Sequence, residues 1–539
     1  MIHLQDIVTN KNKVFQIDVY LGGLYNKVSI LGAINLEWVD TKLSNDLEDS
    51  YTFKREIKKS TIYFLDGEIA LRKQILNSKA FKQIKVEKNI ISDFYTMDIE
   101  TIKLDNGKLS PYLICAYDRI NYITSYNSDQ ETLFTSFFEQ LLSKIKPGTT
   151  IIYAHNLSAF DGIFLMRYLL RYGVVDPLLH NSKLLTIKVS LGNKTILFKD
   201  SYLLLPLSLR KLCKAFNVEQ VKSFFPFKLT NIFYTGVFPK FEYWTGIDLA
   251  QYELLKLPFK STFWEFQKEA IKYCKLDCQS LHEILIKFGE LIFKEFQVDI
   301  HKSLTLPSLA LNIYRVHFLS KDTIYQILEN IEQAIRESYT GGAVDVYIPH
   351  NKTSGFFGKL EANLFCYDVN SLYPSVMANN PMPVGLPTYF EGDIRRIELD
   401  SYGFFYCKIT SPDYLEHPIL QRRIKTSDGL RTIAGLGSWE GRICSAELDN
   451  AVKFGYQFEI LKGYQFETGD LFSEYVNRMY NLRLQYDKGT PMNLIAKLLM
   501  NSLYGKFAMK LERKEKKLWS SIPQLLSIEE AVRPKDLGG

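Results

Sequence analysis

The segment "DFYTMDIET", residues 93–101, constrains the fold more than any other short segment of the chain. Its alternation of apolar and acidic residues predicts a β-strand whose Met97 and Ile99 face a core. Asp98 and Glu100 then share the opposite face, where their negative charges repel each other unless a cation lies between them. A solvated strand face would show the same alternation, so this pair alone leaves both interpretations open.

Two later segments supply further carboxylates. "TTIIYAHNLSAFDG" predicts a strand over 150–154, a polar loop and a helix that begins near Phe160, with Asp161 in its first turn. An acid at that position also stabilises a helix N-terminus without any ligand. "EAIKYCKLDCQSL" predicts an amphipathic helix on which Tyr273 and Asp277 lie four residues apart on one face. A surface pair would have the same spacing.

Taken together, these segments place several acids on three elements of one α/β unit. The four carboxylates are Asp98, Glu100, Asp161 and Asp277. Four oxygen ligands suit a pair of Mg²⁺ ions that bind a scissile phosphate between them, with Tyr273 positioning the attacking water. Cys274 and Cys278 also lie four residues apart, but the two further ligands that zinc requires are missing nearby. The sequence therefore predicts a magnesium site and no zinc site.

In order and local sequence, these segments resemble the three motifs of DEDD-type 3′–5′ proofreading exonucleases. "DVNSLYPSVM", from residue 368, resembles the first polymerase motif of family-B DNA polymerases, and "KLLMNSLYGKF", from residue 497, resembles their fingers motif. "YTGG" at 339–342 is similar to the linker motif of the protein-primed members, which include polymerases of linear mitochondrial plasmids. The resemblance implies an α/β fold, with an RNase H-like exonuclease domain followed by a partial polymerase domain of palm and fingers.

The resemblance assigns roles in the exonuclease half. It implies that the four carboxylates are metal ligands, and that Tyr273 and Lys222 assist catalysis. It also implies a set of residues that hold the single-stranded 3′ end of DNA. These are Thr101, Tyr153, His155, Asn156 and Phe164. "KDSYLLLPLSLRKLCKAF", from residue 199, resembles the same family without suggesting a role for a particular residue.

The resemblance assigns further roles in the polymerase half. Asp368 is expected to bind metal at the end of a buried strand over 362–368, and Tyr373 to exclude the 2′-OH, which selects dNTPs. Lys497, Asn501 and Tyr504 follow helical spacing on one polar stripe and are expected to meet the triphosphate and the incoming base pair. The remaining predicted substrate contacts are Ser371, Leu372, Gly505, Tyr339, Gly341 and Gly342. The region between the two polymerase motifs is expected to contact a terminal protein that primes synthesis.

The predicted organisation has four parts. They are 1–90, of unknown role; 91–290, the exonuclease domain; 291–343, a helical linker ending in the YTGG motif; and 344–539, the partial polymerase domain. Within the last part we expect strands around 344–348, 362–368 and 403–410, and helices around 444–454 and 471–505. The later Asp-Thr-Asp motif of the family is absent from the sequence, so the chain is expected to be C-terminally incomplete. A stand-alone exonuclease with a polymerase remnant, or a non-catalytic remnant that binds DNA or terminal protein, would fit the same observation.

Composition adds weaker constraints. The net charge of +6 is too small to indicate nucleic-acid binding by itself. The seven cysteines are scattered, which favours a reducing compartment. The sequence predicts no membrane span. Enrichment in Ile, Lys, Asn, Phe and Tyr, without a recognisable import signal, agrees with synthesis inside a mitochondrion.

Overall fold

The computed structural model describes residues 14–21, 24–31, 52–57, 60–65, 68–180, 183–218, 224–346, 365–427 and 429–509. Contacts within the chain divide it into two compact units. The first unit comprises Met1–Gln83 and Leu319–Ser473, and the second comprises Ile84–Phe318 and Glu474–Gly539. The predicted boundaries at 90, 290 and 343 do not coincide with this division. The reason is that strands from the N-terminal segment join a sheet with strands that follow residue 381.

A seven-stranded mixed sheet forms the centre of the second unit, in the order β10-β11-β12-β9-β6-β7-β8. β6 and β12 both pair parallel with β9, and the other neighbours pair antiparallel. The order β8-β7-β6-β9-β12 is the one expected of an RNase H-like domain. The strands are β6 (Tyr95–Lys103), β7 (Leu109–Tyr117), β8 (Tyr122–Tyr126), β9 (Gly148–Ala154), β10 (Val174–His180), β11 (Lys183–Leu191) and β12 (Lys194–Asp200).

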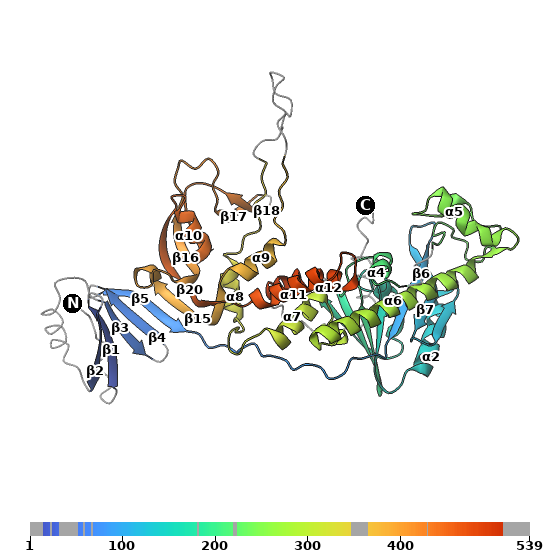
Figure 1. Ribbon diagram of the computed structural model, residues 1–539, viewed down its shortest axis with the longest axis horizontal. Coiled ribbons are helices and arrows are strands. Elements are labelled where there is room, and N and C mark those ends of the chain that lie inside the picture. Colours follow the sequence, from blue (N-terminus) through green and yellow to red (C-terminus); the bar gives the residue numbers. More distant parts are fainter. Residues whose placement is uncertain are drawn as a thin grey trace, which may run out of the picture. The chain divides into compact units, whose positions relative to one another are not determined.

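Helices cover both faces of this sheet. α2 (Gln130–Lys144) begins at Asp129, whose side chain accepts a hydrogen bond from the Thr132 N–H. Together with α3 (Asp161–Leu169) it buries an apolar cluster that includes Phe134, Leu165 and Ile99. The 31-residue α6 (Phe266–Phe296) packs on β6 and β7 through a second cluster, which contains Cys115, Ala270 and Cys278. Figure 1 shows α6 running along this sheet.

The remaining elements of the second unit are mostly short helices. They are α4 (Leu209–Ala215), α5 (Leu249–Lys256), α7 (Leu306–His317), the two-residue strands β13 (Thr235–Gly236) and β14 (Trp264–Glu265), α11 (Ser473–Gln485), α12 (Pro491–Met500) and α13 (Leu503–Phe507). The helix predicted over 471–505 is thus three helices. The first break contains Gly489 at φ 93°, a conformation that favours glycine. α12 and α13 pack on α7.

A nine-stranded antiparallel sheet forms the first unit, in the order β19-β16-β20-β15-β5-β4-β3-β1-β2. Its strands are β1 (Val14–Leu21), β2 (Leu24–Leu31), β3 (Thr52–Ile57), β4 (Ser60–Leu65), β5 (Glu68–Ile75), β15 (Met382–Gly392), β16 (Tyr402–Thr410), β19 (Ser438–Cys444) and β20 (Gln457–Gly469). β5 pairs with β15, which joins the N-terminal strands to the later ones. The strand predicted over 403–410 is β16.

Other elements of this unit are α8 (Glu329–Arg336), α9 (Leu372–Asn379), α10 (Ser445–Val452) and the hairpin of β17 (Gln421–Thr426) and β18 (Gly429–Ala434). α10 fulfils the prediction of a helix around 444–454, and it packs on β16 and β19 over a core that contains Phe390 and Phe405. In the part of the chain that the structure describes, no helix is both long and apolar enough to cross a membrane.

Two predicted strands, 344–348 and 362–368, are not observed in the residues that the structure describes. Residues 365–370 are exposed and irregular, so the prediction that Asp368 ends a buried strand is wrong; 362–364 lie outside the described residues. Residues 344–346 are likewise exposed and without a strand, and 347–348 lie outside the described part. The apolar run before Asp368 has no neighbouring strand in the described chain, and an apolar run alone does not establish strand pairing.

Candidate active site

β6 separates its acids from its apolar residues as its alternation predicts. Met97 and Ile99 are buried in the cluster under α2 and α3. Asp98 and Glu100 point to the other face, toward α6, where Glu100 is 8% exposed and Asp98 is half-buried. The strand therefore holds two carboxylates on a rigid element instead of on a solvated surface.

Asp161 comes to the same place from a different element. Met97 pairs with Ala154 at the end of β9, so the loop after β9 begins beside Asp98 and leads into α3. Asp161 is 1% exposed, and its Oδ1 accepts a hydrogen bond from the Ile99 N–H at 3.1 Å. Burial and, secondarily, the charge of Asp98 hold the pKa of Asp161 well above its usual range. The like charges are therefore close enough to disfavour ionisation of the group.

α6 adds Tyr273 and Asp277, which are 2% and 4% exposed. Burial raises the pKa of Tyr273 most, and the charges of Asp277, Glu100 and Asp98 raise it further, so these acids surround the phenol. The structure thus brings the five predicted exonuclease residues together from β6, α3 and α6. This convergence follows from parallel pairing of β6 with β9 and from the packing of α6 across β6.

Cys274 is a neighbour that the sequence analysis discounted as a zinc ligand. Its Sγ lies 3.9 Å from Asp98 Oδ2, and one ligand atom each from Asp98, Glu100 and Cys274 lie within 4.8 Å of one another. Burial raises the pKa of the Cys274 thiol well above its usual value, and burial raises that of Cys278 to about 12. Zinc sites usually take most of their ligands from Cys and His, whereas here a single thiol lies beside carboxylates. Among the described residues, the donor set is therefore mainly one of carboxylates.

These carboxylates fit a divalent cation that prefers oxygen. Buried acids that raise one another's proton affinity are stabilised by a bound cation, and carboxylate oxygens are the ligands that Mg²⁺ takes. The fit rests on geometry, since ligand atoms of Asp98 and Glu100 lie within 4.8 Å of each other and the buried Asp161 is bonded to the same strand at Ile99; the raised pKa of Asp161 agrees with it.

The predicted DNA-end residues divide into accessible and inaccessible ones. Thr101 and Phe164 are half-buried, Asn156 is exposed, and the Phe164 ring packs edge-to-face on Phe160 at 5.4 Å. Tyr153 is 0% exposed and its hydroxyl bonds to His301 Nδ1 at 3.1 Å, so the prediction that its ring contacts DNA is wrong. Its strand is central in the sheet, and alternation alone does not show which face of such a strand is covered.

His155 is half-buried, and both of its ring nitrogens already have protein partners. Nε2 lies 2.9 Å from the Leu207 carbonyl, and Nδ1 lies 3.0 Å from Ser201 Oγ. These bonds tie the loop after β9 to the loop after β12. His155 is therefore placed to support the loop that presents Asn156.

Asp200, at the end of β12, is a residue that the sequence analysis missed. It is 1% exposed, and its two oxygens accept hydrogen bonds from the N–H groups of Asn156, Ser158 and Tyr202 at 2.8–2.9 Å. These bonds hold Asn156 at φ 73°, in the left-handed region. The local signal was only an acid at the end of the run "KTILFKD", which does not reveal its hydrogen-bond partners.

The predicted polymerase residues lie on exposed segments. Asp368 is exposed, Ser371 has φ 52°, and Leu372 and Tyr373 open α9 with 51% and 57% exposure. Tyr339, Gly341 and Gly342 are exposed after α8. All of these belong to the first unit.

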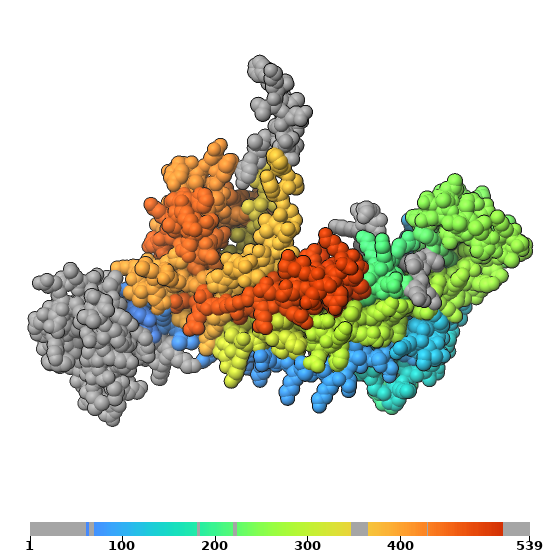
Figure 2. All heavy atoms as spheres, viewed as in Figure 1, coloured from blue at the N-terminus to red at the C-terminus, as the bar shows by residue number. Residues whose placement is uncertain are grey.

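The fingers-motif residues belong to the second unit. Lys497 and Tyr504 are exposed on α12 and α13, Asn501 is exposed between the two helices, and Gly505 is half-buried. Figure 2 shows the atoms of α11 to α13, in red, exposed on the side that faces the viewer. All three side chains of the predicted polar stripe are exposed, but they do not lie on one helix, because α12 ends at Met500. Lys222 lies outside the described residues.

Comparisons with known proteins agree with this arrangement. The sequence pattern of a family described as DNA polymerase type B, organellar and viral, matches residues 141–530. A probable DNA polymerase of Ascobolus immersus is 35% identical over 87% of this chain, and one of Neurospora intermedia is 34% identical over 91%. A ternary complex of Phi29 DNA polymerase with primer-template DNA and incoming nucleotide matches with a TM-score of 0.52 and 19% identity, over 78% of this chain and 68% of that one.

The fold is therefore that of a family-B DNA polymerase with an exonuclease domain. Within that class, the chain belongs to the type-B DNA polymerases of organelles and viruses. It spans 40% of the length of the Ascobolus relative and 54% of the Neurospora relative.

Proposed function

We propose that the chain is a protein-primed DNA polymerase with 3′–5′ proofreading activity, which replicates a linear DNA element. Family membership over residues 141–530 carries the polymerase part of the proposal. The convergence of buried carboxylates in the second unit carries the exonuclease part. The Phi29 complex, with its primer-template DNA and incoming nucleotides, supports DNA and dNTPs as the substrates of this chain.

For the exonuclease, we assign Asp98, Glu100, Asp161 and Asp277 as ligands of Mg²⁺. When bound, the two cations would stabilise the charge that develops on the scissile phosphate. Tyr273, held among these acids with a raised pKa, stays protonated and donates its O–H to orient water. Thr101, Asn156 and Phe164 contact the DNA end, and we keep Lys222 as an assisting cation.

For polymerisation, we assign Asp368 as a metal ligand and Tyr373 as the residue that excludes ribonucleotides. Their exposure leaves both accessible to a nucleotide. Lys497 offers a point charge to the triphosphate, while Asn501 and Tyr504 lie against the base pair. The other proposed contacts are Ser371, Leu372, Gly505, Tyr339, Gly341 and Gly342.

The region between the two polymerase motifs would contact a terminal protein. The fungal relatives, together with the composition, support a mitochondrial location for the protein, with its gene on organellar DNA such as a linear plasmid.

One experiment tests both activities. A 5′-labelled primer on a template is incubated with the purified chain and Mg²⁺, with and without dNTPs. We expect shortening of the primer without dNTPs. The Asp-Thr-Asp motif of the family is absent from the sequence, so extension with dNTPs is expected only after a segment that carries this motif is joined to the chain. Asp368→Ala should abolish only extension, and Asp98→Ala with Glu100→Ala should abolish only shortening. Extension that persists in Asp368→Ala would contradict the polymerase assignment.

A specific observation favours a second candidate, a 3′–5′ exonuclease without polymerase activity. The exonuclease acids are gathered, whereas no group of three potential metal ligands within the described ranges includes Asp368. Shortening without extension by the chain joined to that segment, under all dNTP concentrations, would establish this second function.

A further inference from the structure

A pocket of about 280 Å³ opens in the first unit, beside the YTGG segment, whose Thr340 lies in its wall. Its walls come from the segment after α8 and from β16, β17 and β19. They include Glu337, Thr340, Tyr406, Arg422, Trp439 and Arg442. This volume is near the lower limit of about 300 Å³ for small-molecule sites.

Arg442 is the least satisfied polar group of the pocket. Only 9% of its side chain is exposed, yet its Nε and Nη1 have no hydrogen-bond acceptor among the described residues. Its nearest ionic contact is Glu337, whose Oε2 lies 3.5 Å from Nε. The guanidinium also lies 5.6 Å from the centre of the Tyr406 ring and 5.5 Å from that of Tyr464. Aromatic faces attract a cation but accept no strong hydrogen bond from it.

Arg422 repeats this arrangement on the neighbouring wall. Its guanidinium lies 4.9 Å from the centre of the Trp439 ring, and its buried Nε has no acceptor within the described residues. A buried donor left without an acceptor is destabilising. Two such arginines on one pocket therefore favour a ligand that brings acceptor oxygens.

Three glutamates, Glu337, Glu440 and Glu447, and three arginines, Arg422, Arg423 and Arg442, line the pocket. Glu440 accepts a hydrogen bond from the Tyr406 hydroxyl at 2.9 Å. Glu447 is half-buried, and burial raises its pKa. Glu337 faces Arg442, but its side chain is 62% exposed. An entering anion can therefore displace Glu337 from Arg442 by letting it turn into solvent.

We propose that this pocket is a binding site for one phosphorylated nucleotide, separate from the catalytic sites. Arg422 and Arg442 donate hydrogen bonds to the phosphate, since guanidinium groups match phosphate oxygens in pairs. Trp439 and Tyr406 provide ring walls for the base, which is the usual protein contact of an unpaired base. A nucleotide carries phosphate and ring in one ligand, whereas an acidic peptide offers only the anion.

The site is linked to the YTGG segment. Glu337 lies two residues before that segment, and Arg423 on β17 donates to the Tyr339 carbonyl at 3.0 Å. The phosphate of the nucleotide and Glu337 compete for Arg442. Removal of the phosphate should therefore weaken nucleotide binding, whereas removal of the Glu337 charge should strengthen it. These two expected effects on nucleotide binding do not depend on whether the chain polymerises DNA.

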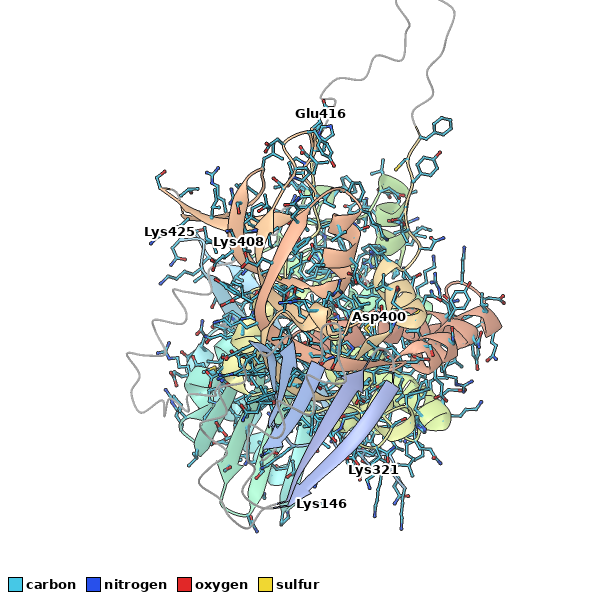
Figure 3. All side chains as sticks on the ribbon, turned by 90° about the vertical axis from the view of Figure 1, so that its left-hand side faces the viewer. Lys146, Lys321, Asp400, Lys408, Glu416 and Lys425 are labelled. Carbon is cyan, nitrogen blue, oxygen red and sulfur yellow. The ribbon has the colours of Figure 1, made fainter. Side chains whose placement is uncertain are left out.

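The test measures binding of dAMP by calorimetry, to the chain carrying Asp98→Ala and Glu100→Ala and in the presence of EDTA, which keeps the metal sites from contributing. Arg442→Gln should weaken binding at least 10-fold. Glu337→Gln should tighten it about 3-fold, a change that a folding defect would not produce. Lys425→Gln, which removes an equal charge from the outer part of the same hairpin, should leave binding unchanged (Figure 3).

Further probes identify the ligand. Deoxyadenosine should bind at least 10-fold more weakly than dAMP, because it lacks the phosphate. Tighter binding of the oligonucleotide (dT)₄ than of dAMP would identify single-stranded DNA as the source of the nucleotide, and the reverse would identify free nucleotides. Equal affinity of Arg442→Gln and the parent chain, or binding of an oligoglutamate peptide in place of dAMP, would overturn the proposal.

Discussion

The predicted metal-binding acids of the two units differ in burial and in how closely they lie to one another. In the second unit, β6, α3 and α6 bring Asp98, Glu100, Asp161 and Asp277 together, and burial and, secondarily, the charge of Asp98 raise the pKa of Asp161. In the first unit, Asp368 is exposed on an irregular segment. Buried like charges store electrostatic repulsion that a cation relieves, whereas an exposed acid is already stabilised by water. The acids of the second unit are therefore preorganised for metal, and Asp368 is not.

The largest expected effect tests the preorganised acids. Asp98→Ala combined with Glu100→Ala should lower Mg²⁺-dependent release of nucleotides from a 3′-labelled single strand by on the order of 1,000-fold or more, because it removes two adjacent ligands of preorganised charge. Asp105→Ala with Asp176→Ala, two exposed acids of the same unit, is the matched control and should leave the rate unchanged. Wild-type digestion by the first double variant would refute the site.

The next effect concerns Asp200, which supports the loop beside the acids. Asp200→Ala should lower the free energy of unfolding by about 4 kcal/mol, since three backbone N–H groups lose their acceptor. Urea denaturation measures this difference. Asp176→Ala on β10 should change stability by less than about 0.5 kcal/mol. If the two variants were equally stable, Asp200 would not organise the loop.

An intermediate effect tests the exposed side of the comparison. In a chain completed with the Asp-Thr-Asp motif, Tyr373→Val should reduce the preference for dNTPs over rNTPs by roughly 100-fold, or about 3 kcal/mol, because the ring no longer excludes the 2′-OH. Since Tyr373 is 57% exposed, folding should be unaffected. Single-nucleotide insertion with each substrate gives the ratio. Tyr373→Phe retains the ring and should retain the preference, so loss of discrimination in both variants would argue against a steric role.

The smallest expected effect is on the pH dependence of stability. It tests the burial of a single ionisable group in the second unit, in contrast to the cluster of acids. Burial lowers the pKa of His282 to about 4, while an unfolded histidine titrates near 6.5. The unfolded state therefore binds more protons between these values, and stability falls as the pH drops through this window. Between pH 7 and pH 5 this residue should account for a loss of about 2 kcal/mol.

His282→Phe should remove that part of the pH dependence. The ring of His282 stacks on Phe94 at 4.4 Å, so phenylalanine preserves the packing. Urea denaturation at the two pH values compares it with His417→Gln, a change at an exposed histidine. An unchanged pH dependence in His282→Phe would show that other groups govern acid sensitivity.

The candidate exonuclease residues were predictable because local patterns define them. Alternation in "TMDIE" determines which residues of β6 face each side of the sheet, and helical spacing places Tyr273 beside Asp277. The role of Asp200 was not predictable, because its three hydrogen-bond partners come from a loop and a turn that only sheet pairing brings together. Tyr153 was misassigned for the same reason, since its burial depends on His301 and Phe94 from distant segments.

By itself, the sequence determined the family, the order of the motifs and the carboxylates of the second unit, since these depend on residue type and short-range period. Only the tertiary structure decided that the N-terminal strands extend the sheet of the first unit through β5 and β15, that Asp368 is exposed, and that Arg422 and Arg442 share a pocket. Strand pairing and burial depend on contacts between residues far apart in the chain. Their free energy is set by the surfaces that meet, and no local pattern encodes which surfaces these are.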